Sequence, residues 1–297
     1  MEFIQRGALI QKIKESVENG NGLAIGKLGF SEQFLLGYLP YKQKNPRQIQ
    51  LKAYEAMLRY HCEVQFGVFP TNPSFLQEFA QFYEKHIKQL DILGLFQSEQ
   101  EDKIIKENKL TAHFIPYQHT EPDRSIPANE PNCYLQYFAG KKLILISPYA
   151  DLLKLRATKE IFESVWSNIH KKWFQPSEIR SYEIPYSYVN SIHTHRKYLN
   201  SINLFKSICT EIDKIEFDIA FIGAGALGLP IASHIKGQGK IAISLGGHLQ
   251  VLFGVGGSRW YKDEFWTTNY INKHWVDMPE RYHPKNKLSL TDKGAYW

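Results

Sequence analysis

The sequence of 297 residues is poor in cysteine and contains no long hydrophobic run. Its three cysteines, Cys62, Cys133 and Cys209, are odd in number and far apart, which argues against a disulfide scaffold and against a zinc module. No segment approaches the roughly 18 uninterrupted apolar residues that a membrane helix needs. The first residues also lack the apolar core of a secretory signal peptide, so we expect a cytoplasmic protein in a reducing compartment.

Long runs of one charge are absent as well, although the balance is basic. There are 36 Lys and Arg residues against 30 Asp and Glu, a formal charge of +6. This surplus suits an anionic partner such as nucleic acid, a phospholipid headgroup or a phosphorylated small molecule. The densest basic patch is only Lys171-Lys172 beside Trp173, so a nucleic-acid-binding tail is disfavoured. The hydrophobic content of 43% excludes a disordered chain.

Apolar periodicity predicts an α/β arrangement along the chain. Buried strands are expected at residues 23–25, 113–116 and 141–148, and helices at residues 7–19, 32–38 and 152–166 and, with one interruption, across 51–96. Ser31 is expected to cap the helix that follows it. The polar segment 98–132 is predicted to be a long connection around the strand at 113–116.

The most informative region lies between residues 204 and 260. A strand at 218–222 is followed by Gly223-x-Gly225-x-x-Gly228, a helix at 229–235 and a second strand at 240–244. The two strands are expected to be parallel, with a right-handed crossover. Glycines at this junction let the backbone turn tightly and approach a phosphate, which the free N–H groups of the helix would bind.

This glycine fingerprint is typical of dinucleotide-binding proteins, but one part of it is missing. NAD-binding folds place an acidic residue at the end of the second strand to bind the ribose, and NADP-binding folds normally use a nearby arginine. Here the second strand ends in Ile243-Ser244-Leu245-Gly246-Gly247-His248, without either residue type. Three interpretations stay open, namely dinucleotide binding, binding of another nucleotide or phosphate, and tight packing alone.

A second glycine-rich stretch follows, with polar and aromatic side chains in it or beside it. These are His248, Gln250, Arg259 and Trp260. The planar guanidinium of arginine suits a phosphate, and a tryptophan can stack on a base or a sugar. The alternative is a salt-bridged arginine and a core tryptophan.

Taken together, these segments resemble the GT-D-like glycosyltransferase domain of bacterial capsule and O-antigen gene clusters. The resemblance rests on residues 218–228, 245–254 and 259–260, and extends in the same order to 25–32, 67–73, 140–151, 274–276 and 294–297. It implies one Rossmann-like α/β domain over residues 1–297, a parallel sheet flanked by helices, whose half at about 204–260 binds the nucleotide. The implied activity is transfer of a sugar from a nucleotide-sugar donor to a growing bacterial surface glycan.

The resemblance also directs attention to the first predicted strand. GT-D enzymes carry an Asp-x-Glu motif there, which binds the metal and the diphosphate, whereas this sequence has Phe30-Ser31-Glu32, so only the glutamate carries over. We therefore expect Glu32 as the catalytic base and as the one family metal ligand, and Asp151 as the second carboxylate to test. Dependence on Mn²⁺ or Mg²⁺ stays open. Glu32 could equally be a charge partner of its helix N-terminus.

The remaining candidates are expected to bind the donor. They are Gly26, Lys27, Gly29, Gly223, Gly225, Gly228, Gly246, Gly247, His248, Gln250 and Arg259. The expected partners are the nucleotide-sugar donor and a glycan acceptor, without nucleic acid and without a transmembrane segment, while peripheral membrane association and a homo-oligomer stay open. Two other classes remain as alternatives, a non-catalytic nucleotide- or glycan-binding subunit and an NAD-dependent oxidoreductase.

Overall fold

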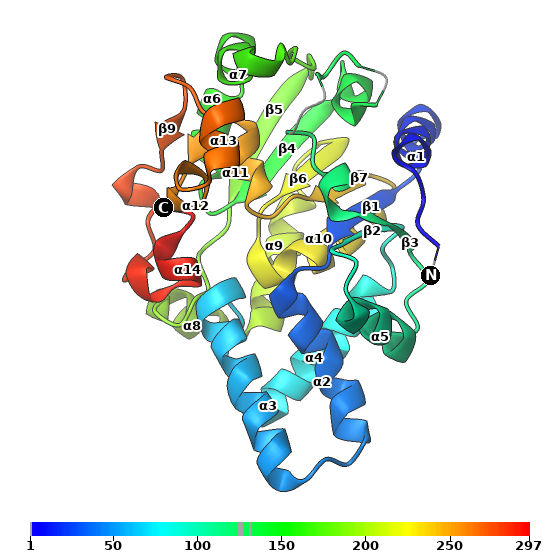
Figure 1. Ribbon diagram of the computed structural model, residues 1–297, viewed down its shortest axis with the longest axis vertical. Coiled ribbons are helices and arrows are strands. Elements are labelled where there is room, and N and C mark those ends of the chain that lie inside the picture. The colour runs from blue at the N-terminus through cyan, green and yellow to red at the C-terminus, as the bar shows by residue number, and fades with distance from the viewer. Residues whose placement is uncertain (1, 124–126, 131) are drawn as a thin grey trace.

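The computed structural model of the protein describes residues 2–123, 127–130 and 132–297, and a seven-stranded parallel sheet forms its centre (Figure 1). The strands are β1 (Leu23–Lys27), β2 (Ile92–Leu95), β3 (His113–Pro116), β4 (Lys142–Ser147), β5 (Glu178–Glu183), β6 (Ile219–Ile222) and β7 (Ile241–Ser244). Their order in the sheet is β3-β2-β1-β7-β6-β4-β5, and every neighbouring pair is parallel. The predicted α/β class with a parallel sheet is confirmed.

Helices cover both faces of this sheet. One face packs against α2 (Phe30–Gln43), α4 (Pro73–Ile87), α5 (Glu99–Asn108), α9 (Ser201–Ile212) and α10 (Gly228–Lys236), and the other against α1 (Arg6–Asn19), α6 (Ala150–Arg156), α7 (Lys159–Val165) and α11 (His248–Leu252). Successive strand side chains point to opposite faces. In β4, Leu143 and Leu145 therefore enter one core, and Ile144 and Ile146 enter the other.

The remaining elements lie outside these layers. Helix α3 (Gln48–Tyr60) continues into a π-helical turn, His61–Phe66, and forms with α2 a hairpin that extends away from the sheet (Figure 1). The C-terminal region contains α12 (Ser258–Tyr261), α13 (Glu264–Asn269), α14 (Thr291–Gly294) and the short parallel pair β8 (Val255–Gly256) and β9 (Val276–Asp277), and α8 (Ile192–Tyr198) precedes α9. Within the described residues, no helix combines the length and the apolar character that a bilayer crossing requires.

The predicted β-α-β unit forms as β6–α10–β7, whose strands are parallel neighbours. The prediction of one long connection over 98–132 is wrong, because its first part folds as α5. Ser98 caps this helix: its hydroxyl accepts the N–H of Glu101, and the carboxylate of Glu101 accepts the N–H of Ser98. This reciprocal pairing is a capping box, a pattern that marks the start of a helix. The apolar residues that follow it, Ile104 and Ile105, are buried.

Three further predictions need correction. The region 51–96 is helical only as far as residue 87, because its short apolar run Ile92–Leu95 pairs in the sheet as β2. The helix at 152–166 is two helices, α6 and α7, since Thr158 caps the second one by accepting the N–H of Ile161. Ser31 is not a cap: Gly29 holds that position, and the Ser31 hydroxyl donates to the Gln65 side chain at 2.9 Å.

Candidate functional site

A cavity of about 660 Å³ opens at the carboxyl ends of the central strands. The chain leaves β1 into α2, which packs on one face of the sheet, and leaves the neighbouring strand β7 into α11, which packs on the other face. Such a switch point leaves a crevice beyond the strand ends, where open α/β sheets bind ligands. The size of the cavity suits a small organic molecule.

The structure brings most of the predicted residues to this cavity. Its lining includes Lys27 at the end of β1, Gly29 and Glu32 after β1, Gly223 and Gly225 after β6, Gly246, Gly247 and His248 after β7, and Arg259 from α12. The lining does not include Gly26, Gly228, Gln250 or Asp151. Residues distant in sequence therefore meet because parallel strands end at one edge of the sheet.

Glu32 lies in the first turn of α2, half-buried in the cavity wall. Burial raises the pKa of its carboxyl to about 7, against the opposing effects of its own backbone N–H and of the Lys27 charge. The cap of this helix is Gly29, where an added Cβ would lie 2.3 Å from Glu32 Oε2, so any side chain there would displace the carboxylate. A carboxyl with a pKa near 7 can accept or donate a proton at neutral pH.

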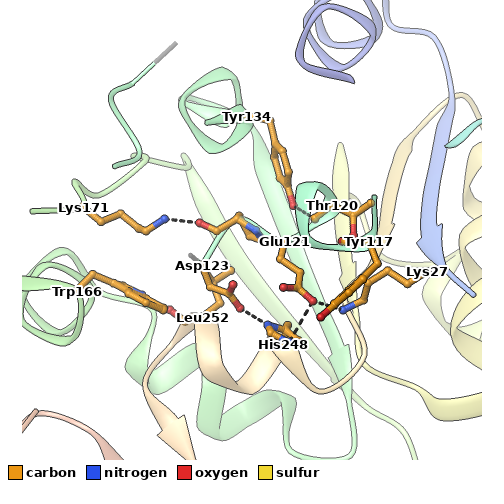
Figure 2. A network of polar contacts seen from close by, with 11 residues as sticks. Lys27, Tyr117, Thr120, Glu121, Asp123, Tyr134, Trp166, Lys171, His248 and Leu252 are labelled. Carbon is orange, nitrogen blue, oxygen red and sulfur yellow. Dashed lines mark hydrogen bonds and ion pairs between the residues drawn. The ribbon is translucent and has the colours of Figure 1, made fainter. Parts of the chain in front are cut away.

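Four ionisable side chains form a connected network, which Figure 2 shows from close by, and three of them, Lys27, Glu121 and His248, line the cavity. Lys27 Nζ lies 2.8 Å from Glu121 Oε1, and His248 Nε2 lies 3.1 Å from the same oxygen. The other ring nitrogen of His248, Nδ1, lies 2.5 Å from Asp123 Oδ2. Both carboxylates are fully buried. Burial alone would raise the pKa of Asp123, but the charges of His248, Lys171 and Lys27 outweigh it and lower that pKa.

Two segments hold this network in place. The loop after β3 carries Glu121 and Asp123, and it is fixed by the Tyr134 hydroxyl, which donates to the Thr120 carbonyl at 2.6 Å (Figure 2). His248 begins α11, whose end is fixed by Trp166 Nε1 donating to the Leu252 carbonyl at 2.9 Å. The sequence analysis does not predict Glu121 and Asp123, because both lie in the polar segment 98–132, which it interprets as a connection. The signal that could have identified them is their position shortly after the predicted strand at 113–116.

The glycines of the β6–α10 junction are accounted for by close packing. At Gly225, with φ +50°, an added Cβ would lie 2.6 Å from the Phe66 carbonyl oxygen, and at Gly228 it would lie 2.7 Å from Ser244 Oγ. Gly246 differs, because with φ +58° its Cβ position is open space. Close packing therefore requires glycine at Gly225 and Gly228, while Gly223, Gly225 and the loop after β7 also offer backbone to the cavity.

Asp151 and Gln250 have partners elsewhere. Asp151 is exposed at the start of α6, where it accepts the Ser181 hydroxyl at 2.6 Å. Gln250 is fully buried, and its Nε2 donates to the carbonyls of Val255, Gly256 and Tyr296 at 3.1–3.3 Å. Gln250 thus ties the C-terminal segment to α11. Gly26 packs against Leu229, whose Cδ2 would lie 2.0 Å from an added Cβ.

The C-terminal segment supplies an aromatic wall to the cavity. Arg259 Nη1 donates to the Tyr296 hydroxyl at 2.5 Å, and its guanidinium lies 5.1 Å from the centre of the same ring. Trp297 Nε1 donates to the Tyr186 hydroxyl at 2.9 Å, and the two rings meet edge to face. Aromatic faces of this kind bind the apolar face of a sugar or a base.

The position of the family metal motif does not fit a divalent cation. Phe30, with 59% of its surface exposed, stands where the motif has its aspartate, and Glu32 is the one acidic residue in the first turn of α2. Hard divalent cations need several oxygen ligands. A lone carboxyl with a pKa of about 7 is partly protonated at neutral pH and is a poor ligand by itself.

Comparison with known proteins gives one match. A family model described as a GT-D fold-like domain matches residues 4–252. No curated protein and no solved structure matches the chain. The matched region ends with α11, so the segment that supplies Arg259, Tyr296 and Trp297 lies beyond it.

Proposed function

The chain belongs to the GT-D-like family, and we propose that it is a glycosyltransferase that moves a sugar from a nucleotide-sugar donor to a growing bacterial surface glycan. The observation that carries this proposal is the Glu32 carboxyl, whose pKa is about 7, in a cavity at the carboxyl ends of a parallel sheet. A glycosyl transfer needs such a group to take the proton of the acceptor hydroxyl.

The proposed reaction forms one bond and breaks one. The acceptor oxygen bonds to C1 of the donor sugar, the bond from C1 to the phosphate oxygen breaks, and the acceptor proton passes to the Glu32 carboxylate. The leaving nucleotide carries the negative charge away, and a transferase stabilises that charge with positioned donors. Lys27 and Arg259 line the cavity and supply positive charge for this purpose.

The other lining groups have binding roles in this proposal. The backbone at Gly246, open to the cavity, is placed to approach the nucleotide, and Trp297 and Tyr186 offer aromatic surface for a base or a sugar. Covering the reacting atoms with aromatic side chains also restricts the access of water, so hydrolysis of the donor is slower than transfer to the acceptor. None of these steps requires an ion at Glu32.

One observation favours a second candidate function, a subunit that binds a nucleotide or glycan without catalysis. Phe30 replaces the aspartate expected of a GT-D enzyme, so a motif residue is lost while the cavity remains. An NAD-dependent oxidoreductase has less support, because β7 ends at Ser244 rather than at an acidic residue.

The test is a thermal-shift screen of the protein with UDP-, GDP-, CMP- and dTDP-sugars, the free nucleotides, and NAD(P)(H). A ligand present at 100 times its dissociation constant stabilises the folded state by about 2.7 kcal/mol, which such a screen detects. Arg259→Ala removes a cation of the cavity, and Arg180→Ala, at a half-buried arginine of β5 outside the cavity lining, is the matched control.

The proposal expects a shift with one class of nucleotide sugar, reduced in Arg259→Ala and kept in Arg180→Ala. A shift with NAD(P)(H) alone would overturn it in favour of an oxidoreductase. Binding of a nucleotide sugar without any release of sugar or nucleotide would instead identify the non-catalytic subunit.

A further inference from the structure

The network of Lys27, Glu121, Asp123 and His248 has the composition of a metal site at a place other than the family motif. One potential ligand atom each of Glu121, Asp123 and His248 lies within 4.8 Å of the others. The two carboxylates come from the loop after β3, and the imidazole from the first residue of α11. Carboxylate and imidazole together suit transition-metal dications better than Mg²⁺ or Ca²⁺, which prefer oxygen ligands.

The contacts of the His248 ring decide which nitrogen faces an ion. Nδ1 lies 2.5 Å from Asp123 Oδ2, a hydrogen-bonding distance, so the Nδ1 proton is donated to that carboxylate. Nε2 then presents its lone pair toward Glu121 Oε1 at 3.1 Å. Two electron-rich atoms this close need a cation between them, either a proton on Nε2 or a metal ion. Ligands at about 2.1 Å and at right angles around a metal ion lie about 3 Å apart.

A second observation, independent of this spacing, concerns the other oxygen of the Asp123 carboxylate. Asp123 is fully buried, and its Oδ1 has no hydrogen-bond partner within the described part of the chain. Leaving a buried, charged oxygen without a partner is costly. Because Oδ2 of the same carboxylate contacts His248 Nδ1, the unpartnered oxygen keeps a full negative charge buried behind the imidazole, and this charge favours a cation on the other side of the ring.

From these observations we infer that Glu121 and His248 bind a divalent transition-metal ion, and that Asp123 is a positioning residue that orients the imidazole through Nδ1. A carboxylate that holds the non-ligating nitrogen of a metal-bound histidine is a recurrent arrangement. Lys27 Nζ, at 2.8 Å from Glu121 Oε1, occupies one lone pair of this oxygen, so the ion must bind through the other.

The position of this site gives the ion a use, which rests on the proposed function. Glu121 and His248 both line the cavity, so an ion held by them has an open side toward a bound ligand. A nucleotide sugar brings phosphate oxygens, which are ligands for such ions. An ion held by the loop after β3 and by α11 would then supply the positive charge that a GT-D enzyme obtains from the metal bound at its Asp-x-Glu motif, where this chain has Phe30 in place of the aspartate. Ion binding itself does not depend on that function.

The test is a titration of the full chain with Mn²⁺ alone, followed by the electron paramagnetic resonance signal of free Mn²⁺. Wild type is expected to take up one equivalent. Glu121→Gln and His248→Asn should abolish this uptake, and Asp123→Asn should weaken it by about 10- to 100-fold, the range for residues behind a ligand. Glu32→Gln and the control Asp151→Asn should bind as wild type does.

Because Glu121 is buried, its variant could fail to fold, so a second variant keeps the inference testable. His248→Cys with Co²⁺ should produce a thiolate-to-cobalt charge-transfer band that wild type with Co²⁺ lacks, and a spectrum without this band would overturn the assignment of His248. Absence of Mn²⁺ uptake by wild type at millimolar concentration would overturn the site, leaving an imidazolium ion pair only. Loss of uptake in Glu32→Gln instead would place the ion at the family motif.

These readouts separate the two proposals. Mn²⁺ uptake that depends on Glu121, in a protein that binds no nucleotide sugar, would retain the metal site and reject the glycosyltransferase. Donor binding and turnover without any Mn²⁺ uptake would reject the metal site and retain the enzyme.

Discussion

Replacing Glu32 with glutamine should change the stability of the folded protein in a pH-dependent way. Glu32 is half-buried, and its burial raises the pKa from 4.5 to about 7. At about 1.4 kcal/mol per pH unit, this difference corresponds to about 3 kcal/mol. The unfolded chain ionises Glu32 near pH 4.5, whereas the folded chain keeps the proton up to about pH 7. Between these values, rising pH therefore costs the wild type folding free energy.

Glutamine has the same shape and does not ionise, so the variant lacks this loss. Relative to wild type, Glu32→Gln should gain little at pH 4 and up to about 3 kcal/mol at pH 8, with the gain developing between pH 4.5 and about 7. Urea unfolding of both proteins across this pH range measures the difference, and Glu18→Gln at an exposed site shows the effect of removing one charge. A difference between Glu32→Gln and wild type that does not vary with pH would refute the reasoning.

Three further substitutions separate the roles of the remaining residues. Arg259→Ala removes a charged hydrogen-bond donor from the cavity and should weaken binding of the nucleotide sugar by about tenfold in isothermal titration calorimetry, with little change in melting temperature of the free protein. Gln250→Ala breaks three bonds to backbone carbonyls and should cost about 2 kcal/mol in chemical unfolding, and a stability equal to wild type would contradict this role. Asp151→Asn, exposed and outside the cavity, should change sugar transfer by no more than about twofold, and a large loss of transfer would show that Asp151 acts in the reaction after all.

The sequence predicted those parts of the site that are local. Lys27 ends one buried strand and Glu32 follows it, and the two glycine-rich loops follow two others, so strand positions alone place them at one edge of a parallel sheet. The β-α-β unit was predicted because its apolar runs are short, buried and separated by glycines. The raised pKa of Glu32 could not be predicted, since it depends on the side chains that surround it in the fold.

The contacts that the sequence did not reveal are long-range. Asp123 and His248 are separated by 125 positions, and nothing near either residue indicates their pairing. The same holds for Gly225, which lines the cavity as expected but also packs against the Phe66 carbonyl, from a distant π-helical turn that the sequence pattern does not reveal. Gln250 likewise lies in a glycine-rich stretch that suggests ligand contact, whereas its amide donates hydrogen bonds to the carbonyls of Val255, in β8, and Tyr296. A sequence motif therefore predicts the local backbone conformation, whereas the residues that its side chains contact are decided by tertiary packing.

The most direct test of the glycosyltransferase assignment is the release of sugar and nucleotide from the donor that the thermal-shift screen identifies, with water as the acceptor. Wild type should release both at a measurable rate, and Glu32→Gln should bind the donor as well while releasing its products at least about 100-fold more slowly, as expected when a general base is removed. Equal rates of release in the two proteins would contradict the role of Glu32. Tight binding with no release in wild type would contradict the claim that this protein is an enzyme.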